Sequence, residues 1–353
     1  MRPSAISATL SRDGPSRPLG PCTTIHPQPS ENSDPRKAMM QMLSSDLFVS
    51  SGTFMGVPAA DSVRPGQGVI LGIPFDCGTH PTRIGARQGP TAIREQSGLV
   101  RPVLPEMGDR DILAAMEVVD LGNARVVSGE IDPSLAAIEA ALDQVATHGG
   151  YPVTFGGDGL ATLPQLRALH RHYPDLVVLH IDAHTDAYDI EGYNTSTTFT
   201  RAAEEGIVDV TRSFHVGARG TLVMPGVYAH TRSLGYNLIP GSEVRRQGIP
   251  EVVARIRETV RDRPVYLCFD MDYFDPSVAP GVCTPTWGGP DAVSTFELLS
   301  ALEGLRVVAT DINTVSPPHD VGGMTACLAG HVAVIALNIM HAGRNTRPQE
   351  PAR

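Results

Sequence analysis

Two short acidic segments place carboxylates and a histidine at spacings that suit metal binding. One contains Asp182, His184 and Asp186 at alternate positions, and the other contains Asp270 and Asp272 at alternate positions. In extended backbone, alternate side chains point to the same side, so each segment would present its ligands together. A site rich in carboxylate oxygens with one imidazole favours Mn²⁺ over Zn²⁺, with Ni²⁺ and Fe²⁺ as alternatives. The residue types and their spacing therefore predict a site for a divalent metal ion.

Charge repulsion within such a site is a second reason to expect a metal ion. Several carboxylates in one crevice cannot all remain charged and unpaired, because like charges a few ångströms apart repel strongly at reduced dielectric. A divalent cation would remove this repulsion. The alternative is that each aspartate only caps the helix or turn that follows it, as is common after strands. The complete set favours the metal site over capping.

The elements that must position these residues are apolar runs directly before them. From residue 68 onward, short apolar runs alternate with segments of helical periodicity, which is the pattern of βα units in a parallel sheet. The carboxyl ends of parallel strands line the ligand crevice, so the acidic segments should converge there. We expect strands at 69–75, 117–121, 152–155, 176–181, 213–217, 265–269 and 307–312, and helices at about 132–147, 163–171, 250–261, 293–302 and 323–341.

Composition excludes several other classes of protein. A chain of 353 residues that is 41% hydrophobic can bury one large core. The net charge of -10 argues against a nucleic-acid partner, which would need a basic stripe. The five cysteines form no C-x-x-C pair, so a reducing compartment is expected. We see no apolar run near the roughly 18 residues that span a bilayer and no secretory signal, and expect a cytoplasmic protein without a membrane partner.

The two ends of the chain differ from the rest in composition. Residues 1–37 are rich in proline, serine and threonine and poor in large apolar side chains, so we expect a disordered tail. Residues 38–345 should form a single α/β domain, followed by a flexible tail at 346–353.

Several segments resemble the ureohydrolase family, which includes agmatinases and arginases. The segment D-A-H-T-D at 182–186 resembles the family signature D-A-H-x-D, and 269–281 resembles F-D-x-D-x-x-D-P-x-x-A-P-G. Residues 83–94 are similar to the agmatinase segment G-x-R-x-G-P-x-A-I-R. The resemblance covers about residues 65–342 and is closer to agmatinases and guanidinobutyrases than to arginases.

The resemblance implies a three-layer αβα sandwich with a mainly parallel central sheet, the arginase-like fold. It also implies hydrolysis of a linear guanidine by a hydroxide that two Mn²⁺ ions bridge, with release of urea. Asp182 and Asp270 would bridge the ions, and His184 and Asp272 would complete one site. Asp186 would bind the other ion and relay the proton. Symmetric homo-oligomers are typical of the family.

Three positions depart from the family pattern. Gly159 stands where the family motif G-G-D-H has a metal-binding histidine, and Thr195 stands where H-G-T-x-F has a histidine. Thr314 replaces the acidic residue that pairs with the guanidinium in D-x-x-E-V-x-P. We expect Thr195, Ser196 and Thr314 to contact the substrate. Asp158 should support its loop behind the metal ligands.

These departures leave two interpretations open. In one, the protein is a metal-dependent hydrolase with one or two Mn²⁺ or Ni²⁺ per chain, acting on a different small guanidine or amidine. In the other, it is a catalytically silent homologue that joins an active paralogue in a hetero-oligomer. His80 and His319, both in expected loops, are candidates to replace the missing imidazole.

Overall fold

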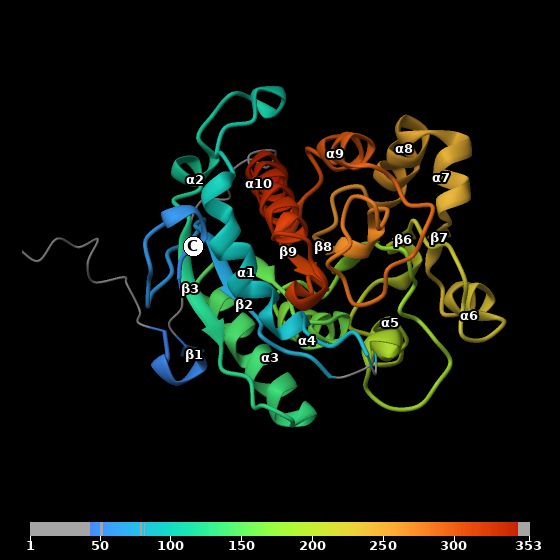
Figure 1. Ribbon diagram of the computed structural model, residues 1–353, viewed down its shortest axis with the longest axis horizontal. Helices are drawn as coiled ribbons and strands as arrows, with labels where there is room; N and C mark the ends of the chain where they lie inside the picture. Colours follow the sequence, from blue (N-terminus) through green and yellow to red (C-terminus); the bar gives the residue numbers. More distant parts are fainter. Residues whose placement is uncertain (1–42, 50–51, 78–79, 81, 345–353) are drawn as a thin grey trace, which may run out of the picture. The chain divides into compact units, whose positions relative to one another are not determined.

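A β-sheet that is parallel except at one edge runs through the part of the chain described by the computed structural model, residues 43–49, 52–77, 80 and 82–344 (Figure 1). Both predicted tails lie outside the described residues, so those predictions stay predictions. Within the described part, the nine strands follow the order β1-β3-β2-β4-β9-β8-β5-β6-β7, and β1 alone is antiparallel to its neighbour. The strands are β1 Phe48–Val49, β2 Gly68–Gly72, β3 Val119–Ala124, β4 Tyr151–Phe155, β5 Val177–Ile181, β6 Phe214–Val216, β7 Asn237–Ile239, β8 Val265–Asp270 and β9 Val307–Asn313.

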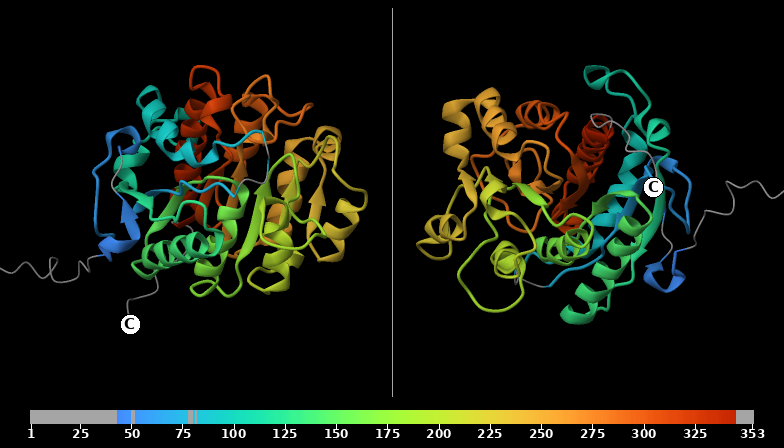
Figure 2. Two further views of the ribbon diagram at one scale, coloured as in Figure 1. Left: turned by 60° about the horizontal axis from the view of Figure 1, so that its bottom comes forward. Right: turned by 180° about the vertical axis from the view of Figure 1, so that it is seen from behind.

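Two layers of helices cover the faces of this sheet (Figure 2). Strand residues alternate between the layers: Val177 and Leu179 of β5 pack into one hydrophobic core, and Val178 packs into the other. The result is the three-layer αβα sandwich that the sequence predicted. On one face lie α1 Gly89–Gln96, α2 Ile112–Ala115, α8 Ile249–Val260, α9 Ala292–Ser300 and α10 Met324–Arg344, and on the other lie α3 Ile131–Thr147, α4 Thr162–His170 and α5 Thr198–Glu204.

The long helix α10 lies within the core beside β9 and α1. It is long and apolar enough to cross a bilayer by length and composition, contrary to the expectation from the sequence, but 78% of its apolar window is buried inside the fold. A helix that is apolar all round is expected where protein surrounds it. The hydropathy of α10 is therefore explained by packing against the sheet.

All seven predicted strands and all five predicted helices are present, with boundaries shifted by a few residues. The unpredicted strands are β1 and β7, short strands at the two edges of the sheet. The unpredicted helices are α1, α2, α5, α6 Val227–Ser233 and α7 Gly241–Gln247, none longer than eight residues. Short elements contain too few residues for a clear period of apolar positions.

Candidate metal centre

The acidic segments that follow β5 and β8 lie next to each other because these strands are neighbours in the sheet. Ile181 pairs with Phe269 in parallel register, so the next residues, Asp182 and Asp270, stand at adjoining strand ends. Asp270 also pairs with Asn313 at the end of β9. The carboxyl ends of three neighbouring strands therefore meet, which is where a parallel sheet places its ligand site.

One group of ligand atoms combines residues from both segments. Atoms of Asp182, His184 and Asp272 lie within 4.8 Å of one another. His184 Nδ1 is 3.2 Å from Asp182 Oδ1 and 3.4 Å from Asp272 Oδ2. The other ring nitrogen of His184 lies 3.1 Å from Thr286 Oγ1, and such an outer partner is typical of metal-binding histidines. Two carboxylates and an imidazole fit a divalent cation.

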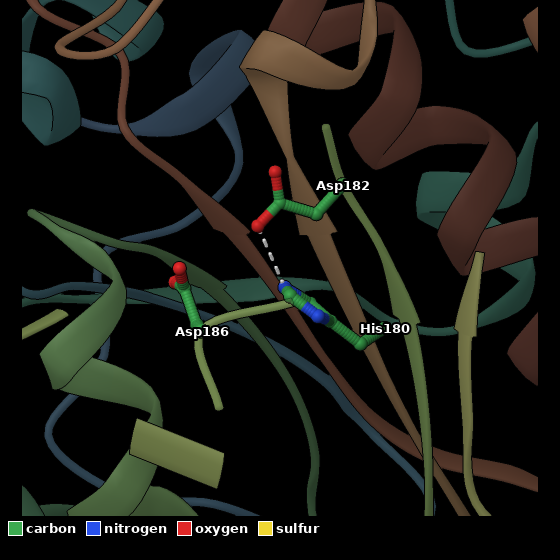
Figure 3. Close-up of side chains that lie close together, drawn as sticks. All are labelled: His180, Asp182 and Asp186. Atoms are coloured by element: carbon green, nitrogen blue, oxygen red, sulfur yellow. Dashed lines mark ion pairs between the residues drawn. The ribbon is translucent and has the colours of Figure 1, made fainter. Parts of the chain in front are cut away.

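A second group shares Asp182 with the first. It contains His180, Asp182 and Asp186, whose ligand atoms also lie within 4.8 Å of one another (Figure 3). We did not predict His180 as a site residue, because it lies inside the apolar run of β5. The sequence feature that could have identified His180 is its position two residues before Asp182, because alternate residues of a strand point to the same side.

Asp270 belongs to neither group among the described residues. It does line the cavity that opens beside the two groups. Its Oδ1 accepts a very short hydrogen bond from the hydroxyl of Thr314 and another, at 3.2 Å, from the backbone N–H of Asp272. The structure thus brings four of the five predicted ligands into two groups and places the fifth beside them. The metal-binding role of Asp270 stays a prediction.

Burial and mutual repulsion govern the charges of these carboxyl groups. Burial, and then the charges of Asp272 and Asp182, raise the pKa of Asp270 well above its ordinary value, and burial and Asp182 do the same for Asp186. Burial would also raise the pKa of Asp182, but His180 and His184 outweigh it and hold that pKa well below its ordinary value. These acids cannot all be ionised together without a cation.

Two residues of the centre have strained backbone. Asp186 has φ 46° and Thr314 has φ 68°, in the left-handed region that residues other than glycine rarely adopt. Both side chains line the cavity. Such conformations cost about 1–3 kcal/mol each and concentrate at functional sites. The backbone strain therefore coincides with the residues expected to act.

A cavity of about 200 Å³ opens beside the two ligand groups. Thr195, Ser196 and Thr314, the three residues predicted to contact substrate, all line it. Arg83 lines it as well, with Nε and Nη2 donating to backbone carbonyls of Pro280 and Val282. The cavity could hold a small organic molecule between these hydroxyl groups and the guanidinium of Arg83.

Asp158 and Gly159 shape the loop after β4. Asp158 is buried, and its carboxylate accepts hydrogen bonds from the backbone N–H of Cys77 at 2.6 Å and of Leu160 at 3.2 Å. Gly159 lies so close to its neighbours that a Cβ would stand 2.8 Å from Thr195 Cγ2 and 2.9 Å from Asp186 Oδ2. Thr195 therefore occupies the space into which a side chain at position 159 would point.

The two loop histidines lie in neither ligand group of the described part of the chain. His80 Nδ1 accepts from the backbone N–H of Arg83 at 3.1 Å, and His319 Nδ1 lies 2.9 Å from Ser316 Oγ. Their ring nitrogens on that side are thus engaged by their own loops. His80 does line the cavity beside the two groups, and replacement of the missing imidazole by His80 or His319 stays a prediction.

Comparisons with known proteins show the family to which this sequence is similar. A family model described as "Arginase family" matches residues 67–338. The chain is 38% identical to a guanidinopropionase of Pseudomonas aeruginosa, over 85% of this chain and 92% of that protein. It is 32% identical to a mitochondrial guanidino acid hydrolase of Homo sapiens, over 79% and 80% of the two chains.

Solved structures give the same result for the fold. The chain is similar to the proclavaminate amidino hydrolase of Streptomyces clavuligerus, with a TM-score of 0.79 and 30% identity over 84% of this chain and 99% of that one. It is also similar to a hypothetical agmatinase of Burkholderia thailandensis, with a TM-score of 0.77 and 28% identity over 85% and 93%. Each of these similarities covers more than four fifths of this chain.

Proposed function

Because the chain belongs to the arginase family, we propose that it is a metal-dependent hydrolase that cleaves a carbon–nitrogen bond of a small guanidine or amidine. The observation that carries this proposal is the pair of ligand groups that share Asp182 at the ends of β5 and β8. Relatives named guanidinopropionase and guanidino acid hydrolase support the guanidino group as the reacting part. The oxygen-rich donor set favours Mn²⁺, with Ni²⁺ as the alternative.

The acidic residues would have two roles in the reaction, metal binding and proton transfer. A divalent ion, when bound, would supply Lewis acidity that makes water a nucleophile near neutral pH. Asp182, His184 and Asp272 would hold such an ion. Asp186 lines the cavity in a buried position and shares a ligand group with Asp182. Asp186 is therefore suited to take up a proton and deliver it to the departing amine.

Thr314 would act on the substrate through its oxygen. Its hydroxyl hydrogen is donated to Asp270, so the lone pairs of Oγ1 are what remain for a ligand. A guanidinium carries only N–H donors and needs acceptors of this kind. A neutral acceptor binds a cation less strongly than a carboxylate does, which favours substrates that gain binding energy elsewhere.

Arg83 supplies that additional binding energy in our proposal. Its guanidinium is fixed by the carbonyls of Pro280 and Val282 at the edge of the cavity, and it brings positive charge to a cavity otherwise rich in carboxylates. A substrate with a guanidino group at one end and a carboxylate at the other would satisfy both ends. We therefore propose guanidino acids, in preference to agmatine, as the substrate class.

Release of urea or ammonia from a panel of substrates tests this function. The panel contains guanidinopropionate, guanidinobutyrate, agmatine, arginine and N-substituted guanidines, each with Mn²⁺ and with Ni²⁺. We expect turnover of a guanidino acid, and loss of at least about 100-fold in kcat for Asp186→Asn, because proton transfer typically contributes 10²–10⁴-fold. Equal rates for Asp186→Asn and the unchanged protein would contradict the assignment.

The second candidate function is a catalytically silent homologue in a hetero-oligomer. The observation in its favour is that Thr195 occupies the space beside Gly159, so that the centre lacks a side chain there. This function predicts no turnover across the panel together with stable co-purification of an active paralogue. Turnover by the isolated chain would exclude it.

A further inference from the structure

His180 lies inside the metal centre although it belongs to the body of β5. Its side chain is almost fully buried, and Nε2 lies 3.0 Å from Asp182 Oδ2. Asp186 completes a group in which the three ligand atoms lie within 4.8 Å of one another (Figure 3). His184, the imidazole expected from the sequence, belongs to the other group.

His180 Nε2 and Asp182 Oδ2 lie 3.0 Å apart in a buried position. Among the residues that the structure describes, no hydrogen bond is recorded to the buried Oδ2 of Asp182, although Nε2 stands within hydrogen-bond distance of it. Two ligand atoms that are each about 2.1 Å from one ion lie about 3.0–3.4 Å apart, depending on the angle between them. The observed distance agrees with two ligands of a single ion.

The far side of the His180 ring also has the surroundings of a metal ligand. Nδ1 lies 2.9 Å from His215 Nδ1, so one of the two rings must donate and the other accept. When His180 donates through Nδ1, its Nε2 keeps a free lone pair on the side of Asp182 and Asp186. Metal-binding histidines commonly donate their other N–H to an outer partner in this way, which fixes the tautomer.

Aromatic packing fixes the plane of the ring. The centroid of His180 is 4.4 Å from that of Phe199 and 5.1 Å from that of His215. His215 packs in turn against Tyr236, with the centroids 4.7 Å apart. The imidazole is thus held in one orientation, as a ligand must be for a well-defined site.

We propose that His180 is a metal ligand, and that its Nε2 binds an ion shared with Asp182 and Asp186. This ion would lie beside a second one held by Asp182, His184 and Asp272. Gly159 offers no donor on the Asp186 side, and His80 and His319 are outside both groups of the described residues. The inference rests on the proposed function, because it needs the metal centre to exist.

Metal content of matched variants tests the inference. His180→Phe keeps a ring for packing and loses the donor nitrogen, whereas His215→Phe changes the buried neighbour that lies in neither ligand group. Each full-length protein is stripped with EDTA, dialysed against MnCl₂ and analysed for manganese per chain, with folding checked by circular dichroism. We expect about two Mn²⁺ in the unchanged protein and about one in His180→Phe. We expect about two in saturated His215→Phe, with affinity lowered about 10–100-fold at most.

A direct measurement covers the case in which His180→Phe does not fold. Pulsed electron paramagnetic resonance of the unchanged protein, labelled with ¹⁵N-histidine and loaded with Mn²⁺, should show nitrogen couplings from two histidines. Couplings from one histidine only, or equal manganese content in folded His180→Phe and the unchanged protein, would overturn the inference while leaving the proposed function intact. If the wild-type protein binds neither Mn²⁺ nor Ni²⁺, both the role of His180 and the proposed function are wrong.

Discussion

At the scale of single residues, the centre depends on how closely side chains and backbone approach one another. Asp182 is the residue common to both ligand groups, and its two oxygens face different imidazoles, Oδ1 near His184 and Oδ2 near His180. Asp186 approaches Gly159, where there is no room for a Cβ. The affinity of the centre should therefore respond to changes as small as one methyl group.

Substitution of Gly159 by alanine tests this close approach. The new Cβ would stand 2.8 Å from Thr195 Cγ2 and 2.9 Å from Asp186 Oδ2, so one of these side chains must move. We expect Gly159→Ala to weaken Mn²⁺ binding by about 10-fold, a typical effect of displacing the support of a ligand. Thr195→Ser in the same chain removes the contacting methyl group and should restore part of the affinity. Titration calorimetry with MnCl₂ measures both, and an unchanged affinity in Gly159→Ala would contradict the proposed crowding.

Asp158 should make the free energy of unfolding depend on pH, with a direction that follows from its raised pKa. Burial raises the pKa of Asp158 from 3.8 to about 6. The folded state therefore keeps a proton that the unfolded state releases between about pH 4 and pH 6, so the contribution of Asp158 to stability is full below about pH 4 and is lost as the pH rises through about 6. In EDTA, Asp158→Asn should gain free energy of unfolding relative to the unchanged protein as the pH rises over this range. Urea denaturation at several pH values would show two parallel curves if this account were wrong.

Residue chemistry alone predicted part of the centre. Asp182, His184 and Asp272 were identified from their alternate spacing, and the structure brings their ligand atoms together. His180 was missed because an isolated histidine in an apolar run is indistinguishable from a buried structural one. Only the folded structure shows that its Nε2 lies 3.0 Å from Asp182 Oδ2, in a group that also contains Asp186.

At the scale of elements, the position of the centre follows from strand order and register. The continuous apolar runs of β5 and β8 identify strands that are covered on both faces. The apolar runs do not show that β5 and β8 are neighbours in the sheet, because β6 and β7 separate them in sequence. Which strands become neighbours depends on packing between distant parts of the chain, so the sequence pattern predicted convergence at one edge of the sheet without predicting which strands pair.

A buried ion pair joins α1 to β3 and shows how such contacts fix an element. Arg94 Nε and Nη2 each donate to a carboxylate oxygen of Asp120 at 2.9 Å, and the two side chains are 2% and 0% exposed. Arg94→Met should lower the free energy of unfolding by about 3–5 kcal/mol, because the buried carboxylate of Asp120 would lose its countercharge and keep only hydrogen bonds from the backbone N–H groups of Phe54 and Gly122. Urea denaturation measures the change.

The matched control is the exposed pair Arg64–Glu117, whose side chains are 57% and 62% exposed. Arg64→Met removes the same charge but leaves Glu117 in water, so the loss should not exceed about 1 kcal/mol. Similar losses for the two variants would show that burial does not set the strength of the pair joining α1 to β3.

At the scale of the whole fold, the residues that the structure describes are arranged around a sheet that is buried on both faces. Alternating βα units predicted this arrangement, since a parallel sheet needs helices on both sides. The short helices α6 and α7 next to β7 were not predicted, and neither were the edge strands. These pieces are positioned by the larger elements, and their own sequences contain little periodic signal.

The central claim is that acids from the ends of β5 and β8 bind metal jointly, and Asp182→Asn tests it most directly. Asp182 is the one residue that both described ligand groups share, so its replacement should reduce manganese content from about two ions per chain to nearly none. Asp311→Asn is the matched control, since Asp311 is a buried carboxylate of neighbouring β9 that lies outside both groups and is bonded to Thr162 and Asn313. The account predicts that folded Asp311→Asn retains its manganese. Undiminished manganese in folded Asp182→Asn would contradict it.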